Sequence, residues 1–164
     1  MRGMHVRASF CATAPPLTAT LAEAAWQLAP PHALAHLWSG ELAPAGLATT
    51  ARLIWTPSHL WVGFECGYVE LDIDDAPDTS VERGALWERD VCEAFIAGPG
   101  EPGPESYKEF EVAPTGQWCD LAIRRPRVDV DWTWHGGMET AAAIDDRIRT
   151  WRAVMRVPFA AFGA

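Results

Sequence analysis

Short runs of alternating apolar and polar residues, divided by frequent turn residues, dominate the pattern of this chain. Such alternation puts every second side chain on one face and is typical of half-buried β-strands. Only residues 20–28 have a spacing that suits a short helix. The runs that predict strands are 51–55, 60–66, 90–96, 107–112, 118–124, 138–144 and 147–157. Many short strands with regular turns predict an all-β fold, a two-layer antiparallel β-sandwich.

Turn residues join some of these runs into hairpins and separate others by loops. Pro57 lies where a type I turn favours proline, so residues 51–66 are expected to form a hairpin. Asp145 and Asp146 mark the turn of a second hairpin. Loops are expected at 29–50, 72–84 and 97–106.

Alternation within three neighbouring strands predicts a core face and a polar face. The core face is expected to hold Cys92, Ala94, Ile96, Phe110, Val112, Cys119, Leu121 and Ile123. The polar face is expected to hold Glu93, Glu109, Glu111, Trp118, Asp120 and Arg124. Val91 and Phe95 flank Glu93 on its own face, and a partly covered acid needs a partner, for which Arg124 or Arg125 is nearest by pattern. An ordinary solvent-facing sheet with cross-strand ion pairs is the alternative interpretation.

The net charge is unevenly distributed along the chain. The 164 residues fit a single domain over 1–164 and carry a net charge of −9. Residues 65–111 hold fourteen acids and three bases. Such a region repels phosphate backbones, which argues against nucleic acid as a partner. It suits neutral polyols or a hard cation such as calcium, with a solvated acidic loop as the alternative.

The cysteines and the first residues narrow the class of protein further. The four cysteines are Cys11, Cys66, Cys92 and Cys119. None belongs to a C-x-x-C pair, so free buried thiols are expected in place of a zinc site, and disulfide pairing stays open. No apolar run approaches the roughly 18 residues of a membrane span, so no membrane partner is expected. Residues 1–20 lack the apolar centre of a secretion signal, which predicts a cytoplasmic protein if Met1 is the true start.

Acids and indole rings occur together from residue 84 onward, and the chain holds nine tryptophans. Carboxylates accept hydrogen bonds from hydroxyl groups, and a flat aromatic face can cover the C–H face of a pyranose. The combination favours a non-catalytic surface that binds a mono- or oligosaccharide. The candidate residues are Trp87, Glu88, Asp90, Glu93, Glu109, Glu111, Trp118, Arg124, Trp132 and Trp134.

Five runs in one order carry a resemblance to a known family. They are 49–55, 60–66, 86–96, 107–120 and 151–159, the last a tryptophan-led run that ends in Pro158 and Phe159. Together they resemble the carbohydrate-binding module family 9-like group over about residues 24–162. The resemblance implies a DOMON-like β-sandwich that grips a sugar end between two tryptophans, with acids and an arginine around it. Trp87 would be one wall, and Trp132 or Trp134 the other.

The resemblance also suggests a departure at the end of the chain. Relatives continue past the position of Phe159 into a further strand, whereas this sequence stops at Ala164. The sandwich is therefore expected to lack its last strand, and self-association through an open sheet edge is a possible partner interaction.

Calcium is a possible ligand, because some members of the resembled family hold it. The candidate ligands are Asp72, Asp74, Asp75 and Asp78. Their spacing differs from an EF-hand, since the twelfth position from Asp72 is Arg83 where that motif has glutamate.

Other functions fit the sequence less well. No G-x-S-x-G elbow, glycine-rich phosphate loop or H-E-x-x-H motif occurs, and no spacing selects a catalytic pair of carboxylates. A structural or partner-binding sandwich is the first alternative to sugar binding. Haem binding, as in some DOMON-type domains, is the second; it would use Met138 or Met155 with His135.

Overall fold

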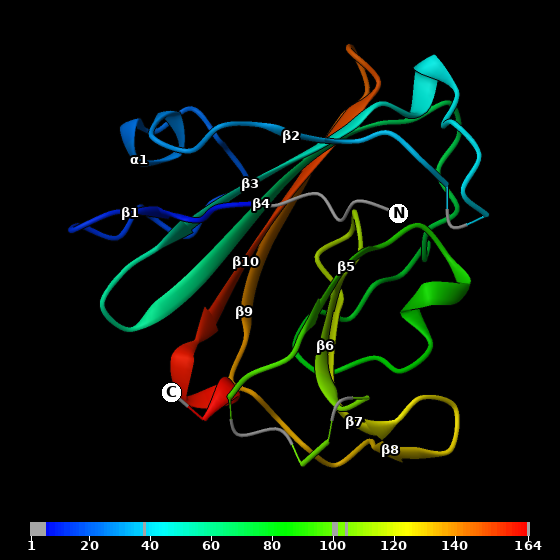
Figure 1. The fold of residues 1–164 in the computed structure, drawn as a ribbon. Coiled ribbons are helices and arrows are strands. Elements are labelled where there is room, and N and C mark those ends of the chain that lie inside the picture. Colours follow the sequence, from blue (N-terminus) through cyan, green and yellow to red (C-terminus); the bar gives the residue numbers. More distant parts are fainter. Residues whose placement is uncertain (1–5, 38, 100–101, 104, 164) are drawn as a thin grey trace.

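Two β-sheets packed face to face form the molecule, as the computed structural model shows (Figure 1). The structure describes residues 6–37, 39–99, 102–103 and 105–163. The strands are β1 Ser9–Phe10, β2 His32–Leu34, β3 Thr49–Trp55, β4 His59–Gly67, β5 Cys92–Ile96, β6 Tyr107–Val112, β7 Trp118–Arg125, β8 Asp129–Asp131, β9 Glu139–Asp145 and β10 Thr150–Pro158. The helical turns are α1 Ala24–Gln27, η1 Ala45–Leu47, η2 Leu86–Glu88 and η3 Phe159–Phe162.

The large sheet has the strand order β1-β3-β4-β10-β9, with β2 paired to β3. Its pairs are antiparallel apart from the short parallel pair of β1 with β3. Opposite charges stand across from each other on its outer face. Arg152 on β10 is the register partner of Glu65 on β4, with Nε 2.6 Å from Oε2. Arg156 and its register partner Glu139 form a second ion pair.

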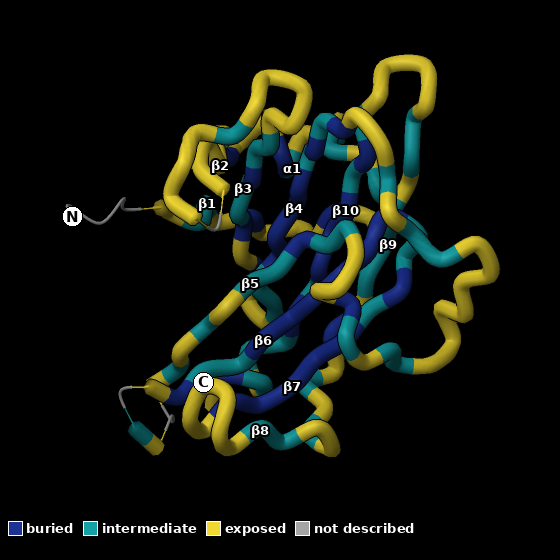
Figure 2. The backbone as a smooth tube through the Cα atoms, turned by 90° about the vertical axis from the view of Figure 1, so that its right-hand side faces the viewer, coloured by how far each residue is buried: buried dark blue, intermediate teal, exposed yellow. Residues whose placement is uncertain are grey.

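The small sheet has the strand order β5-β6-β7-β8, and all its pairs are antiparallel. Its inner face packs against the inner face of the large sheet, so the buried parts of β6, β7 and β10 lie between exposed loops (Figure 2). Phe110 and Val112 from β6 meet Met155 and Val157 from β10 in this core. Burial of these apolar side chains is the main force that holds the two sheets together.

Two thiols also meet across the core. Cys66 on β4 and Cys92 on β5 are buried, and their Sγ atoms lie 3.4 Å apart. All four cysteines are free and buried, which confirms the default interpretation of Cys66, Cys92 and Cys119.

The outer face of the large sheet is partly covered by the N-terminal segment. Trp26 of α1 is fully buried against Ile54, Trp61 and Val154. Gly63 on β4 makes this approach possible, because a Cβ there would lie 3.0 Å from the Trp26 ring and 2.6 Å from Leu21 Cδ2. The covering segment therefore depends on a position without a side chain.

The predicted all-β sandwich and both hairpins are confirmed. The helix expected at 20–28 is a single turn, α1. The loop expected at 29–50 also contains β2 and η1, which are too short for a period to show. Of the loop expected at 97–106, residues 100–101 and 104 lie outside the described residues. The closing strand β10 is internal to its sheet, with β9 on its far side.

Candidate functional site

The outer face of the small sheet collects glutamates from two strands. In the register of β5 with β6, Glu93 stands opposite Glu111, and Phe95 stands opposite Glu109. Because register partners share a face, all four side chains point away from the large sheet. This part of the predicted polar face is confirmed.

The third strand was assigned the wrong way round. Phe110 of β6 is the register partner of Asp120 on β7, so Asp120 and Trp118 belong to the inner face. Cys119, Leu121 and Ile123, which were expected in the core between the sheets, lie on the outer face with the glutamates. There they pack under Leu86 of η2. Alternation gave the correct grouping within β7, but it carries no information on which group faces the other sheet.

Three of the glutamates form one cluster, here called the glutamate triad: Glu93, Glu109 and Glu111. One carboxylate oxygen from each lies within 4.8 Å of the other two. Glu111 is fully buried, Glu109 is 8% exposed, and Glu93 is half-buried. Among the described residues, neither carboxylate oxygen of Glu111 has a hydrogen-bond partner. The triad therefore brings three carboxyl groups together, and no ion pair between described residues gives any of them a basic partner.

Burial and mutual repulsion change the acidity of the triad. Burial, and then the charges of Glu109 and Glu93, raise the pKa of Glu111 to about 9. Burial also raises the pKa of Glu93 and of Glu109 above the ordinary value. The expected basic partner of Glu93 is absent from this cluster, because Arg124 pairs instead with Asp129 at 3.6 Å and Asp131 at 3.4 Å. The sequence suggested Arg124 or Arg125 as this partner, and no ion pair between described residues joins either of them to Glu93.

Two exposed tryptophans lie against each other beside this face. Trp87 in η2 is 44% exposed and Trp132, after β8, is 51% exposed; their ring centroids are 5.6 Å apart with the planes at 38°. η2 packs on β6, and its Leu86 lies on the outer face of the small sheet, so Trp87 lies on the same side of that sheet as the triad. Rings this close touch each other. A sugar between them would need them about 7–8 Å apart, which is two van der Waals contacts.

The other predicted rings have structural contacts. Trp134 meets the edge of Phe110 at a centroid distance of 6.0 Å, and Lys108 Nζ lies 5.1 Å from the Trp134 ring centroid. Trp118 packs against the core between the sheets, and its Nε1 donates to the Thr79 carbonyl at 3.3 Å. Of Trp132 and Trp134, the structure therefore brings only Trp132 to Trp87.

The remaining predicted polar residues lie at the start of β5. Glu88 is exposed on η2. Asp90 is tied to the acidic loop: its Oδ2 accepts a hydrogen bond from the Asp72 amide at 2.7 Å, and its own amide donates to the Asp72 carbonyl at 3.0 Å. Asp90 therefore fixes the loop that carries η2 and leads into β5.

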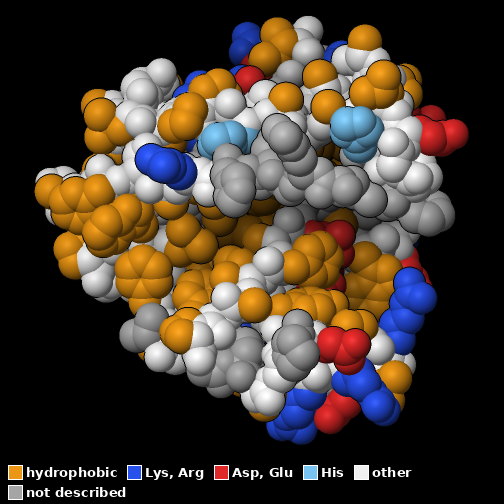
Figure 3. Space-filling model, in the orientation of Figure 1, with side chains coloured by type: hydrophobic (Ala, Val, Ile, Leu, Met, Phe, Trp, Pro, Cys, Tyr) orange, Lys and Arg blue, Asp and Glu red, His pale blue; other side chains and the backbone are white. Residues whose placement is uncertain are grey.

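A groove follows the free edge of β5 and reaches the triad. It has a volume of about 410 Å³, and Glu93 and Phe95 line it from β5. Leu34, Leu37 and Leu47 line the opposite side. Figure 3 shows this side of the molecule, with hydrophobic side chains around a recess and acidic side chains within it. The groove gives a ligand a route to the half-buried Glu93.

The four aspartates proposed for calcium are not brought together. Within the described part of the chain, two groups of three ligating side chains have atoms within 4.8 Å, and neither group includes these aspartates. Asp72 pairs with Arg89 at 3.0 Å, and Asp74 pairs with Arg83. Asp78 accepts hydrogen bonds from Ser80. Calcium binding, at these positions or elsewhere, stays a prediction.

The second group of ligating side chains is Glu82, Asp120 and His135, which sequence reasoning missed. His135 Nδ1 lies 3.0 Å from Glu82 Oε2 and 3.6 Å from Asp120 Oδ1. Asp120 Oδ2 accepts hydrogen bonds from the amides of Gly136 and Met138 at 3.0 and 3.5 Å. Burial is the main cause that raises the pKa of Asp120. No local signal joins these three positions, because loops bring them together.

The methionines named for haem have packing roles. Met138 and Met155 are both buried in the core between the sheets. His135, the proposed second ligand, is occupied by its contact with Glu82.

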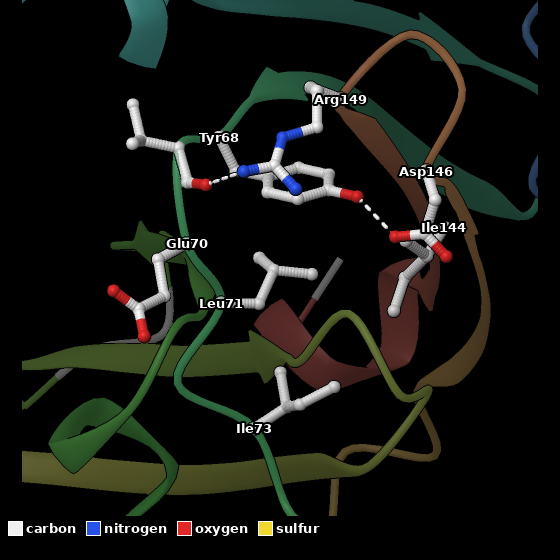
Figure 4. A pocket seen from close by; sticks show the side chains of 8 residues that line it. Tyr68, Glu70, Leu71, Ile73, Ile144, Asp146 and Arg149 are labelled. Carbon is white, nitrogen blue, oxygen red and sulfur yellow. Dashed lines mark hydrogen bonds between the residues drawn. The ribbon is translucent and has the colours of Figure 1, made fainter.

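A separate hollow of about 560 Å³ lies where the chain leaves β4 and passes the β9–β10 turn (Figure 4). The Tyr68 hydroxyl donates to Asp146 Oδ1 at 2.6 Å, and the Arg149 guanidinium lies 5.1 Å from the Tyr68 ring centroid. Arg149 also donates to the Val69 carbonyl. The Tyr68 hydroxyl and the Arg149 guanidinium therefore both have partners, in contrast to the carboxylate of Glu111.

Comparison with known proteins supports the fold. Neither a protein-family model nor a curated protein matches the sequence. Two solved structures share its architecture. A protein from Bacteroides uniformis, whose carbohydrate-binding role is provisional, matches 95% of this chain and 73% of its own at a TM-score of 0.67 and 14% identity. A family 9 carbohydrate-binding module from Caldicellulosiruptor kristjanssonii, in complex with cellotriose, matches 93% of this chain and 67% of its own at a TM-score of 0.61 and 12% identity.

These identities establish a common fold and no more. Among the described helices, none is long and apolar enough to cross a bilayer.

Proposed function

We propose that this protein is a non-catalytic carbohydrate-binding domain whose site is the outer face of the small sheet. The observation that carries the proposal is the pair of exposed, touching rings of Trp87 and Trp132 on the same side of the sheet as three carboxylates. The shared fold with a family 9 module that holds cellotriose supports it. So does the acidity of the region, which favours neutral polyols over phosphates.

Ring stacking supplies most of the affinity in this proposal. Water competes for every sugar hydroxyl, so each hydrogen bond to Glu93 or Glu109 contributes about 1 kcal/mol at most. A pyranose that inserts between Trp87 and Trp132 must separate the two rings by roughly 2 Å. Stacking on two indoles then replaces the contact that the rings lose to each other.

The test is a titration of the purified domain with cellotriose and a panel of oligosaccharides. Calorimetry and tryptophan fluorescence would measure the affinity. Trp87→Ala and Trp132→Ala should each weaken binding about tenfold or more, and Glu109→Gln should weaken it less.

Trp55→Ala is the matched control. Trp55 is 40% exposed on the large sheet, where its ring lies 4.6 Å from Phe10, so its loss should leave the affinity unchanged. Absence of saturable binding across the panel, or equal effects of Trp55→Ala and Trp87→Ala, would contradict the proposal. Release of reducing sugar would argue for an enzyme, and a Soret band after addition of haem would argue for the haem alternative.

A further inference from the structure

The glutamate triad is a place of unbalanced charge in the fold. Glu93 and Glu111 are direct register partners, a position in which two ionised carboxylates would destabilise the sheet, and burial raises the pKa of both. No ion pair between described residues includes a member of the triad. Glu111 is fully buried, and within the described part of the chain neither of its carboxylate oxygens has a hydrogen-bond partner. A positively charged ligand would stabilise a carboxylate that is buried in this environment.

The triad supplies three oxygen acceptors, the number that one kind of cation needs. An ammonium group donates three hydrogen bonds and accepts none. With N···O distances of about 2.8 Å and tetrahedral directions, its three acceptors lie about 4.6 Å apart. The triad offers one carboxylate oxygen from each glutamate, all within 4.8 Å of one another.

We propose that the glutamate triad binds the ammonium group of an amino sugar, so that the preferred ligand is a cationic glycan with free amines. This inference rests on the proposed function, because it assigns the ligand class of the same face. The sugar ring stacks on Trp87 or Trp132, and its ammonium enters beside Glu93, the member of the triad that lines the groove.

The surroundings favour an organic cation over a metal ion. Calcium takes six to eight oxygen ligands, often including backbone carbonyls, whereas the triad supplies three carboxylates. Aromatic rings border the triad: Phe95 is 56% exposed and meets Tyr107 edge-on at 5.5 Å. Ring faces attract organic cations and cover their C–H groups, while a hydrated metal ion gains little from them.

Binding of an ammonium should release protons from the triad. The other titratable groups around it are Glu82 in the preceding loop, Cys119 on β7 and Tyr107 on β6, and they are acids, so they disfavour its ionisation. Arg127 lies near Tyr107 and acts against the rise in its pKa. The ligand's charge would stabilise the ionised carboxylates, so affinity should rise with pH until the sugar amine itself loses its proton.

The experiment compares three trisaccharides of the same length near neutral pH. They are the glucosamine trimer, its fully N-acetylated form and cellotriose, which differ in charge while keeping the rings. The glucosamine trimer should bind about tenfold or more tightly than either neutral trimer, because charge-assisted hydrogen bonds exceed neutral ones. Added salt should reduce that preference.

Two variants test the residues. Because Glu93 is half-buried, the Glu93→Gln variant should fold. It therefore tests the proposal even if the Glu111→Gln variant fails to fold. Either variant should remove the preference for the amine, while the affinity for cellotriose should fall by about fivefold at most, the share of one hydrogen bond. Glu65→Gln, on the large sheet, is the matched control and should retain the preference.

The possible outcomes separate the two proposals. Equal binding of all three trimers overturns the inference and leaves the proposed function intact. No binding of any sugar overturns both. Binding of calcium alone that displaces the glucosamine trimer, or binding of free lysine as tight as that of the trimer, overturns the amino-sugar assignment in favour of a metal or amine site.

Discussion

The outer faces of the two sheets place charges in opposite ways. On the large sheet, Arg152 stands opposite Glu65 and Arg156 opposite Glu139, so each acid has a base as its register partner. On the small sheet, Glu93 stands opposite Glu111. Register partners therefore form acid–base ion pairs on the large sheet, whereas on the small sheet two acids face each other.

The difference extends to the tryptophans. Trp26 covers the outer face of the large sheet and is fully buried, while Trp87 and Trp132 stay exposed beside the small sheet. The outer face of the large sheet buries the rings of Trp26 and Trp61 and pairs Glu65 and Glu139 with arginines. The small sheet does neither, which is the physical reason to place the site there.

The largest expected effect comes from the buried ring. Trp26→Ala should lower the free energy of unfolding by about 3–5 kcal/mol, because it leaves a cavity against Ile54 and Trp61. Trp87→Ala should change it by less than about 1 kcal/mol, since the ring is 44% exposed. Urea unfolding measures both. Equal losses would mean that Trp87 supports the fold as Trp26 does.

A covalent link between the sheets should have the next largest effect. Cys66 and Cys92 close a segment of 26 residues, and their Sγ atoms lie 3.4 Å apart. Refolding in an oxidised glutathione buffer should join them by thiol exchange and raise the free energy of unfolding by about 3 kcal/mol. Burial raises the pKa of the Cys92 thiol, so the native protein should react slowly. Peptide mapping should find the Cys66–Cys92 link, and a link through Cys11 or Cys119 would contradict the sheet packing.

A buried acid without a partner should cost stability, so its removal should increase it. At pH 7 the folded protein keeps a proton on Glu111, whose pKa is about 9, against an ordinary value of 4.5 in the unfolded chain. Glu111→Gln should therefore raise the free energy of unfolding by about 2–3 kcal/mol at that pH.

The pH dependence has a defined sign. Because the folded pKa is the higher one, the stability contributed by the bound proton is fully present below pH 4.5 and is lost as pH rises towards 9. The free energy of unfolding of the natural protein should fall across this window, and Glu111→Gln should flatten the slope. An unchanged slope would show that Glu111 ionises normally.

The same substitution on the large sheet should have the opposite sign and the smallest size. Glu65→Gln removes the partner of Arg152, but the two side chains are 46% and 29% exposed. The free energy of unfolding should fall by less than about 1 kcal/mol. If Glu65→Gln instead raised the free energy of unfolding, the proposed difference between the two outer faces would be contradicted.

The parts of this fold that sequence could predict are those governed by neighbours within one strand. Alternation placed Ala94 and Glu93 on opposite faces, because side chains in a strand alternate regardless of the rest of the fold. It failed for Asp120, whose face depends on the register with Phe110 in another strand.

The candidate site depended still more on distant contacts. The glutamates could be grouped from alternation, but the meeting of Trp87 with Trp132 is made by two loops with no period of their own. The cluster of Glu82 with His135 arises in the same way. Such contacts between distant loops depend on how the whole chain packs, and the pattern of apolar and polar residues in one sequence does not indicate them.

The central place of β10 has a consequence for how the protein is made. Its partner β4 ends at Gly67, whereas β10 begins at Thr150. One edge of β4 thus stays unpaired on the ribosome until residues 150–158 have emerged, and contacts between such distant segments form slowly. During that interval an apolar strand edge is open to other nascent chains. Synonymous codon changes that slow translation of residues 68–149 would lengthen the interval and lower the yield of folded protein without altering a single amino acid.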